Sequence, residues 1–189
     1  MEADEKRIQT ELKIQKAFIK IVKEKSFDKL TISALIKEAK INRGTFYIHY
    51  LDKYDLKSHY EDEMILDIKS IFSNYEKPDS LRNQGNDDAF LQLFKYLYRQ
   101  RSLSVILLTD FGSDFINEVK KLILNLARNN SIKDSRLPQR FASEMLTQDI
   151  LNFLVYWLMQ TPVLKPKKIY EIFLYTRKLT PEQLSYKCF

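Results

Sequence analysis

Residues 31–56 read TISALIKEAKINRGTFYIHYLDKYDL, and this stretch decides which fold the chain can adopt. Its first part repeats apolar residues three and four positions apart, as one buried face of a short helix requires. Thr31 stands where an N-cap is expected, Lys40-Ile41-Asn42 is a tight turn, and residues 43–50 form a second short helix. Two short helices joined by a turn of this length describe a helix-turn-helix.

The rest of the chain reads as further helices. An amphipathic helix over residues 4–25 precedes the motif, and a helix from residue 53 to about residue 75, capped by Asp52, follows it. Residues 76–88 are the best linker candidate. The later helices are expected at residues 88–100, 103–109, 113–129, 138–160 and 166–178. Only three glycines and five prolines occur in 189 residues, and this scarcity of turn formers also favours an all-α chain of about nine helices.

Several classes of protein find no support in the composition. The single cysteine, Cys188, excludes an internal disulfide and a cysteine-based zinc site. No nucleophile with its base, phosphate loop or carboxylate constellation stands out, so we expect no enzyme activity, cofactor or metal. No signal peptide is visible, and no stretch reaches the roughly 18 apolar residues of a membrane span. We therefore expect a cytoplasmic protein without a membrane partner.

Positive charge concentrates at the N-terminal end. Residues 1–60 hold 13 Lys and Arg against 9 Asp and Glu, a balance of +4, whereas the remaining residues hold 18 against 16, a balance of +2. An excess of this kind suits phosphate binding, although a solvated basic face would have the same composition.

The second short helix carries the residues that can read DNA. Arg43 offers paired donors for guanine O6 and N7 in a major groove, although a solvated arginine beside phosphates fits equally well. Gly44 lets the backbone approach DNA closely, which compensates for its helix cost of about 1 kcal/mol. His49 lacks a second ligand at metal-binding spacing, so we expect no metal there. The residues expected to contact DNA are Thr31, Ser33, Asn42, Arg43, Gly44, Thr45, Tyr47, His49, Tyr50 and Lys53.

Residues 31–56 resemble the signature of the TetR/AcrR family of bacterial regulators. The landmarks that match are Thr31, Ala39, Gly44, Thr45, Tyr47, His49, Tyr50, Lys53 and Leu56. Lys40 departs from the family, which often has glycine in this turn, but a lysine can adopt the left-handed conformation at modest cost. Tyr156-Trp157-Leu158 and the helix led by Pro166 are similar to the branch that contains activators of dihydroxyacetone kinase genes.

The resemblance implies a transcriptional regulator that binds double-stranded DNA as a homodimer on an inverted-repeat operator. It implies a helix-turn-helix domain over residues 1–52 and a larger helical domain for ligand binding and dimerisation over residues 53–189. A helical adaptor without DNA binding is the alternative reading. The sequence identifies neither the operator nor the direction of regulation, although repression is the more usual outcome in the family.

Two sets of apolar residues are candidates for the function of the second domain. A pocket for a small apolar effector would be lined by Phe72, Phe90, Phe94, Phe111, Phe115 and Trp157. A place in the ordinary helical core would explain each of these residues equally well. The helices at residues 138–160 and 166–178 carry more apolar surface than one neighbouring helix would cover. We therefore expect a two-fold interface that contains Leu151, Leu154, Leu158, Ile169 and Phe173.

Overall fold

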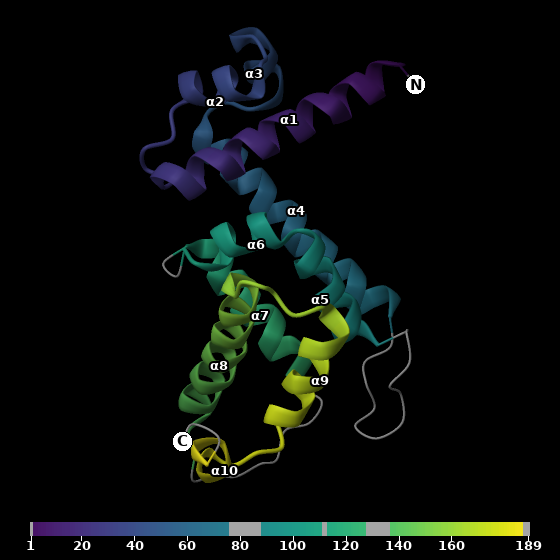
Figure 1. Ribbon diagram of the computed structural model, residues 1–189, viewed down its shortest axis with the longest axis vertical. Coiled ribbons are helices and arrows are strands. Elements are labelled where there is room, and N and C mark those ends of the chain that lie inside the picture. Colours follow the sequence, from purple (N-terminus) through teal and green to yellow (C-terminus); the bar gives the residue numbers. More distant parts are fainter. Residues whose placement is uncertain (1, 76–87, 111–112, 128–136, 187–189) are drawn as a thin grey trace. The chain divides into compact units, whose positions relative to one another are not determined.

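The computed structural model describes residues 2–75, 88–110, 113–127 and 137–186. These residues form ten α-helices and no β-strand, which confirms the predicted all-α class with one helix more than expected (Figure 1). The chain divides into two compact units, Met1–Met64 and Ile65–Phe189, and helix α4 contributes residues to both.

Unit 1 is the N-terminal helix-turn-helix region. It contains α1 (Glu2–Lys25), α2 (Ile32–Ala39), α3 (Arg43–His49) and the first half of α4 (Lys53–Asn74). Helix α1 packs along α2, and α2 packs against α3. The largest side chains of its core are fully buried, and they are Ile14, Phe18, Leu30, Leu35, Phe46, Leu56, Tyr60 and Met64. All four helices therefore bury one face in a common core.

Side chains cap the three helices that follow α1, as the sequence predicts. Thr31 Oγ1 accepts a hydrogen bond from the Ala34 N–H at 3.2 Å, and Asn42 Oδ1 accepts one from the Thr45 N–H at 2.7 Å. Asp52 Oδ1 accepts from the N–H groups of residues 54 and 55, both at 2.8 Å. These bonds satisfy N–H groups that a helix start leaves without a partner, and so fix where each helix begins.

The turn between α2 and α3 depends on a left-handed residue. Lys40 has φ 54° and ψ 46°. Its N–H donates to the Lys37 carbonyl, and the Ile41 N–H donates to the Ile36 carbonyl at 3.1 Å. This pair of bonds is a Schellman motif, in which the left-handed position is usually glycine. The lysine therefore takes the family's turn geometry in spite of its side chain.

Unit 2 contains the second half of α4 and the remaining helices. These are α5 (Ala89–Arg99), α6 (Arg101–Leu108), α7 (Asp114–Ala127), α8 (Gln139–Met159), α9 (Pro166–Thr176) and α10 (Pro181–Ser185). Helix α5 packs along α9, and α8 packs against α6 and α7 (Figure 1). Aromatic rings fill the space between α5, α8 and α9: the Phe94 centroid lies 5.1 Å from that of Trp157 and 5.4 Å from that of Phe173.

Two charged side chains fix helix ends in unit 2. The buried carboxylate of Asp88 accepts hydrogen bonds from the N–H groups of Phe90 and Leu91 at the start of α5, and from the Tyr170 hydroxyl of α9. Arg101 donates to the carbonyls of Leu158 and Gln160 at the end of α8, both at 2.6 Å. Asp88 therefore joins the start of α5 to α9, and Arg101 joins the start of α6 to the end of α8.

Three expectations need correction. Pro138 is the N-cap of α8 and does not lie in its first turn. Helix α10 was not expected, although Thr180 and Gln183 form the capping box that a Thr-x-x-Gln sequence indicates. The five residues expected at the two-fold interface are buried in the core of a single chain, so they do not face outward. They are Leu151, Leu154, Leu158, Ile169 and Phe173.

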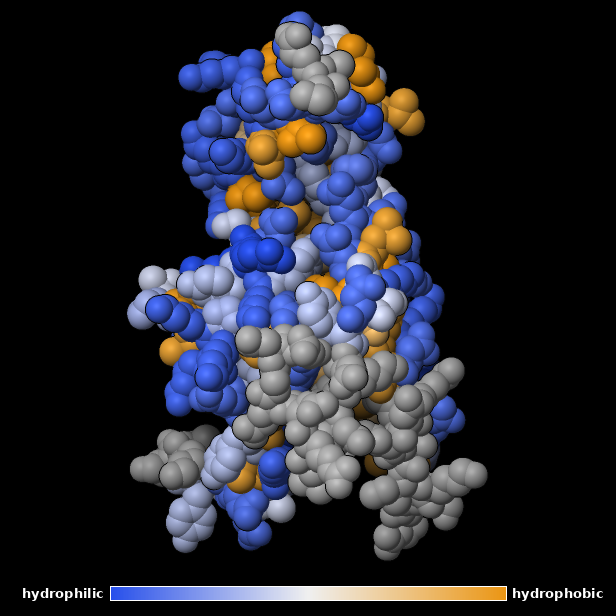
Figure 2. All heavy atoms as spheres, turned by 90° about the vertical axis from the view of Figure 1, so that its right-hand side faces the viewer, coloured by the Kyte–Doolittle hydropathy of each residue, from blue (hydrophilic) through white to orange (hydrophobic). Residues whose placement is uncertain are grey.

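The surface of the described residues is mainly polar on one face. Hydrophilic residues predominate in the view of Figure 2, and hydrophobic residues lie among them in separate groups. No helix in the described parts of the chain is long and apolar enough to span a membrane.

The left-handed turn generates a test of stability. Lys40→Gly should raise the free energy of unfolding by about 1 kcal/mol, because glycine adopts this conformation without the penalty that a Cβ atom brings. Urea unfolding followed by circular dichroism measures the change. Lys40→Ala is the matched control, since it removes the same charge and keeps the penalty. An equal gain in both variants would contradict the conformational explanation.

Candidate nucleic-acid interface

Helix α3 has one buried and one exposed side. Phe46 is fully buried and Tyr50, the residue that ends the helix, is nearly so. Gly44, Tyr47 and Ile48 are exposed, and their spacing of three and four residues places them on a common face. The helix is thus anchored on one side and free to contact another molecule on the other.

Polar groups gather at the N-terminal end of this exposed face. Asn42 Oδ1 accepts hydrogen bonds from both the N–H and the hydroxyl of Thr45, the latter at 2.8 Å. The Arg43 guanidinium lies 5.9 Å from the centre of the Tyr47 ring, within the range of a cation–π contact. Asn42 therefore acts within the chain as a cap, while the side chains of Arg43 and Tyr47 lie at the surface.

Gly44 is not required by the packing of the protein. A Cβ atom at this position would meet only Asn42 Oδ1, at an ordinary contact distance of 3.5 Å. Its φ angle is also not positive. Since alanine would fit and would favour the helix by about 1 kcal/mol, the reason for the glycine lies outside the fold of the chain.

Tyr50 and His49 are directed into unit 1, contrary to the expectation that both contact DNA. The Tyr50 hydroxyl donates to Glu11 Oε1 of α1 at 2.5 Å, and the Tyr60 hydroxyl of α4 donates to the same oxygen at 3.2 Å. His49 Nδ1 lies 3.7 Å from Glu11 Oε2, and its side chain is 12% exposed. In the described residues no group of three or more His, Cys, Asp or Glu side chains is placed to hold a metal ion.

Lys53 is also engaged within the chain. Its ammonium group donates to the carbonyls of Phe27 and Asp28, at 3.2 and 2.9 Å, and lies 5.0 Å from the centre of the Phe27 ring. The start of α4 is occupied as well, because Asp52 caps it and Asp55 Oδ2 accepts from the Leu51 N–H. Lys53 therefore fixes the loop after α1, and its backbone is flanked by two carboxylates that would repel a phosphate.

Thr31 and Ser33 lie at the surface at the start of α2. The structure thus brings Thr31, Ser33, Arg43, Gly44 and Tyr47 to the surface of unit 1, while Tyr50 and Lys53 position helices. The sequence prediction did not include Ile48, which is among the most exposed large hydrophobic side chains of the described residues. Its spacing from Gly44 and Tyr47 could have placed it on the outer face of α3.

Four of the candidate effector residues of unit 2 pack in two aromatic pairs, Phe72 with Phe90 and Phe94 with Trp157. The ring centroids of Phe72 and Phe90 lie 5.1 Å apart, and Phe94 and Trp157 are almost fully buried. Phe115 is also buried, and Phe111 lies outside the described residues.

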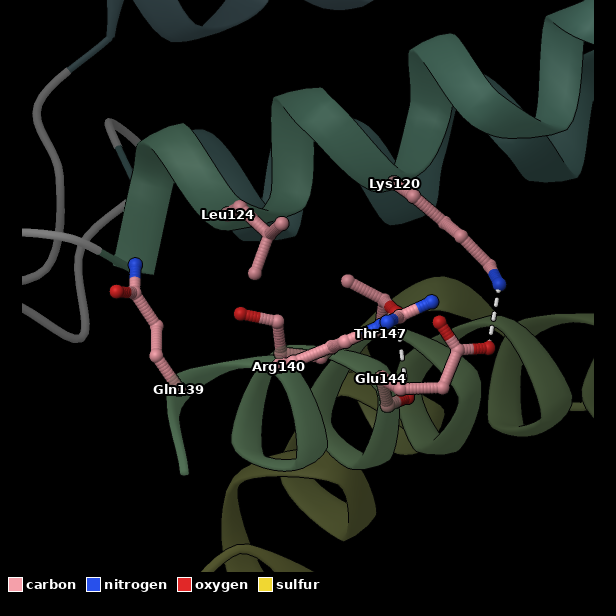
Figure 3. Close-up of a pocket in the computed structure, with 7 residues that line it drawn as sticks. Lys120, Leu124, Gln139, Arg140, Glu144 and Thr147 are labelled. Carbon is pink, nitrogen blue, oxygen red and sulfur yellow. Dashed lines mark hydrogen bonds and ion pairs between the residues drawn. The ribbon is translucent and has the colours of Figure 1, made fainter. Parts of the chain in front are cut away.

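A surface pocket of about 520 Å³ lies between α7 and α8, and none of the six expected residues lines it. Six of its seven lining residues are polar or charged, with Lys120 bonded to Glu144 at 2.7 Å and Arg140 projecting alongside them (Figure 3). This pocket therefore differs in character from the apolar site that the sequence suggests.

Comparison with known proteins agrees with this geometry. Residues 16–58 match the sequence model of bacterial regulatory proteins of the TetR family. Among curated proteins, no sequence relative matches the chain.

Solved structures extend the likeness beyond residues 16–58. A TetR transcriptional regulator from Streptococcus agalactiae 2603V is 23% identical with a TM-score of 0.58, covering 93% of this chain and 97% of that one. The regulator FadR from Bacillus subtilis, solved with stearoyl-CoA, is 16% identical with a TM-score of 0.56, covering 87% and 95%. The dihydroxyacetone kinase operon activator DhaS is 18% identical with a TM-score of 0.54, covering 89% and 95%.

The fold and the exposed helix define the N-terminal unit as a helix-turn-helix domain. Residues 16–58 have the sequence pattern of the TetR family of bacterial regulatory proteins, and the chain has the fold of TetR-family transcriptional regulators. The family resemblance predicted from residues 31–56 is confirmed, and a DhaS structure is among the similar folds.

The contact between Tyr50 and Glu11 generates a prediction on pH. Burial, and then the hydrogen bond to Glu11, raise the pKa of the Tyr50 phenol above its usual value. Above about pH 10 the unfolded chain therefore loses a proton that the folded chain keeps, so this phenol stabilises the fold below pH 10 and loses that effect as the pH rises. The stability difference between the unmodified protein and Tyr50→Phe should be constant from pH 6 to about pH 9.

Above about pH 10 that difference should shrink by up to about 1.4 kcal/mol per pH unit. Urea unfolding at a series of pH values measures it, and the values near pH 7 serve as the internal control. A difference that stays constant up to pH 11 would show that Tyr50 ionises equally in both states.

Proposed function

We propose that the chain is a homodimeric transcriptional regulator that binds a specific inverted-repeat operator in double-stranded DNA. The observation that carries the proposal is the exposed side of α3, where Arg43 and Tyr47 border a glycine that the fold does not require. A missing side chain at the centre of an exposed helix face suits close approach to the edges of bases.

The same proposal assigns a separate role to each part of the chain. Residues 1–52 would bind DNA, and residues 53–189 would dimerise and respond to an effector; the compact units themselves divide at residue 64. Thr31, Ser33 and Tyr47 would contact phosphates, and Arg43 would read a guanine. Asn42, Thr45, His49, Tyr50 and Lys53 would position the helix. A regulator of chromosomal DNA in a bacterium works in the cytoplasm.

Selection of bound sequences from random duplexes tests the proposal, and an inverted repeat is the expected result. On the selected site, Arg43→Ala should cost about 1–3 kcal/mol of binding free energy and relax the preference at one position in each half-site. Gly44→Ala should weaken binding while leaving the free energy of unfolding unchanged or raising it by up to about 1 kcal/mol.

The two readouts separate an interface from a structural role. If Gly44→Ala weakened binding only to the extent that it unfolded the protein, the glycine would have no part in the interface. If no duplex were enriched at modest salt, the chain would be a helical adaptor without DNA binding.

We propose that the dimer forms through the outer face of α8. The exposed apolar residues of this helix follow a spacing of three and four positions, with the hydrogen-bonded pair Gln148 and Asn152 in the middle. The face comprises Phe141, Met145, Gln148, Asn152, Tyr156 and Met159. Two copies of such a stripe can cover one another across a two-fold axis, and Tyr175 of α9 is also exposed.

Charged substitutions in this face should dissociate the dimer. For Met145→Glu and Tyr156→Glu, sedimentation equilibrium at micromolar concentration should give 22.6 kDa, and the unmodified protein twice that mass. Leu66→Glu, which alters another exposed apolar residue, is the control and should remain dimeric. Leu154→Glu should unfold the protein instead, because it buries a charge without a partner. A mass of 22.6 kDa for the unmodified protein would contradict the dimer.

We also propose that a small apolar ligand regulates DNA binding by entering the aromatic core between α5, α8 and α9. The Phe173 ring lies 6.3 Å from that of Phe90 and 5.4 Å from that of Phe94, so a ligand that entered there would have to separate these rings. Helices would move as a consequence, and a ligand shifts the DNA equilibrium only as far as its affinities for the two states differ. The FadR structure, which has a similar fold, contains stearoyl-CoA, a ligand with a long apolar acyl chain on a charged CoA group.

Trp157 provides the test, because it is the only tryptophan of the chain and lies in this core. Titration with stearoyl-CoA or free stearate should change its fluorescence and alter operator affinity by roughly 5- to 150-fold. Phe94→Ala should weaken both effects together. Fluorescence and DNA affinity that both stay constant would exclude ligands of this kind.

A further inference from the structure

The second turn of α3 exposes mainly apolar surface. Ile48 is 83% exposed, and Leu51, just after the helix, is 79% exposed. Tyr47, the residue before Ile48, is 48% exposed. Beyond Thr45, the outer face of α3 therefore offers no Arg, Lys, Asn or Gln to a base edge. Paired hydrogen bonds to a base edge, of the kind that an arginine makes, are therefore available only at the start of the helix, where Arg43 lies.

An exposed isoleucine has one kind of complementary feature in a major groove. It can neither donate nor accept a hydrogen bond, so it cannot recognise the polar edge of guanine, cytosine or adenine. The C5-methyl group of thymine is the apolar group presented there, and contact with it distinguishes thymine from the other bases.

The same face is poorly suited to a protein partner. Its centre is Gly44, which contributes no apolar side chain, and its border is Arg43 with the polar pair Asn42 and Thr45. An apolar docking face for a helix would need side chains at its centre. A duplex, by contrast, needs the close backbone approach that the glycine permits.

We propose that Ile48 is a specificity-determining residue that selects thymine by contact with its C5-methyl group, with Leu51 extending the apolar surface. This inference rests on the proposed function of DNA binding and names the base that the second turn of α3 reads. The operator half-site would then hold a guanine facing Arg43 and a thymine facing Ile48. The two residues lie five positions apart, a rise of about 7.5 Å along the helix.

Replacing thymines of the selected operator one at a time by uracil, in both half-sites, tests the proposal, because uracil lacks only the methyl group. The unmodified protein should lose about fourfold in affinity for each contacted methyl. Ile48→Ala should bind the thymine duplex with a similar loss and show no further loss on uracil at that position. Ile48→Val keeps a branched apolar side chain and should keep most of the sensitivity.

The controls distinguish the role of Ile48 from the proposed DNA binding on which it rests. Leu66→Ala shortens another exposed apolar side chain, outside α3, and should respond to uracil as the unmodified protein does. All variants should share one midpoint of urea unfolding, since Ile48 packs against little of the protein. Uracil without effect on the unmodified protein, or with the same effect on Ile48→Ala, would overturn the role of Ile48 while specific DNA binding stood. Failure to enrich any duplex would overturn the proposed function first.

Discussion

The carboxylate of Glu11 is the polar point at which three helices of unit 1 meet. It belongs to α1, accepts hydrogen bonds from Tyr50 at the end of α3 and from Tyr60 of α4, and lies beside His49. A partly buried acceptor of this kind costs free energy unless its donors stay in place. The end of α3 is therefore held at a fixed position relative to its two neighbours, and the orientation of its exposed face follows from this contact.

The start of α3 is held by different means. Asn42 caps the helix, and the left-handed Lys40 directs the chain into it through paired backbone hydrogen bonds. Phe46 fills the core between the two ends. A helix of seven residues is too short to be stable alone, so its geometry is determined by these tertiary and capping contacts. The exposed residues of α3 take no part in these contacts. They can therefore vary with the proposed DNA target without a change in the geometry of the helix.

Local features of the fold were predictable, and distant ones were not. Thr31, Asn42 and Asp52 cap helices by bonds to residues two or three positions away, which a sequence pattern reveals. The partner of Tyr50 lies 39 residues away, so its direction into the core had no local sign. The spacing of apolar residues likewise does not show whether a helix packs against helices of its own chain or against a second copy of the chain. For that reason Leu154 was assigned to an interface although it is buried within one chain.

The hydrogen bonds of Asp88 have a consequence for engineering the protein. Its carboxylate joins the first turn of α5 to Tyr170 of α9, so the place where α5 begins is set by contacts on its C-terminal side. The register of α5 is thereby independent of how many residues precede Asp88. An engineered chain should therefore keep Asp88, because its loss would release the start of α5 and Tyr170 of α9 together.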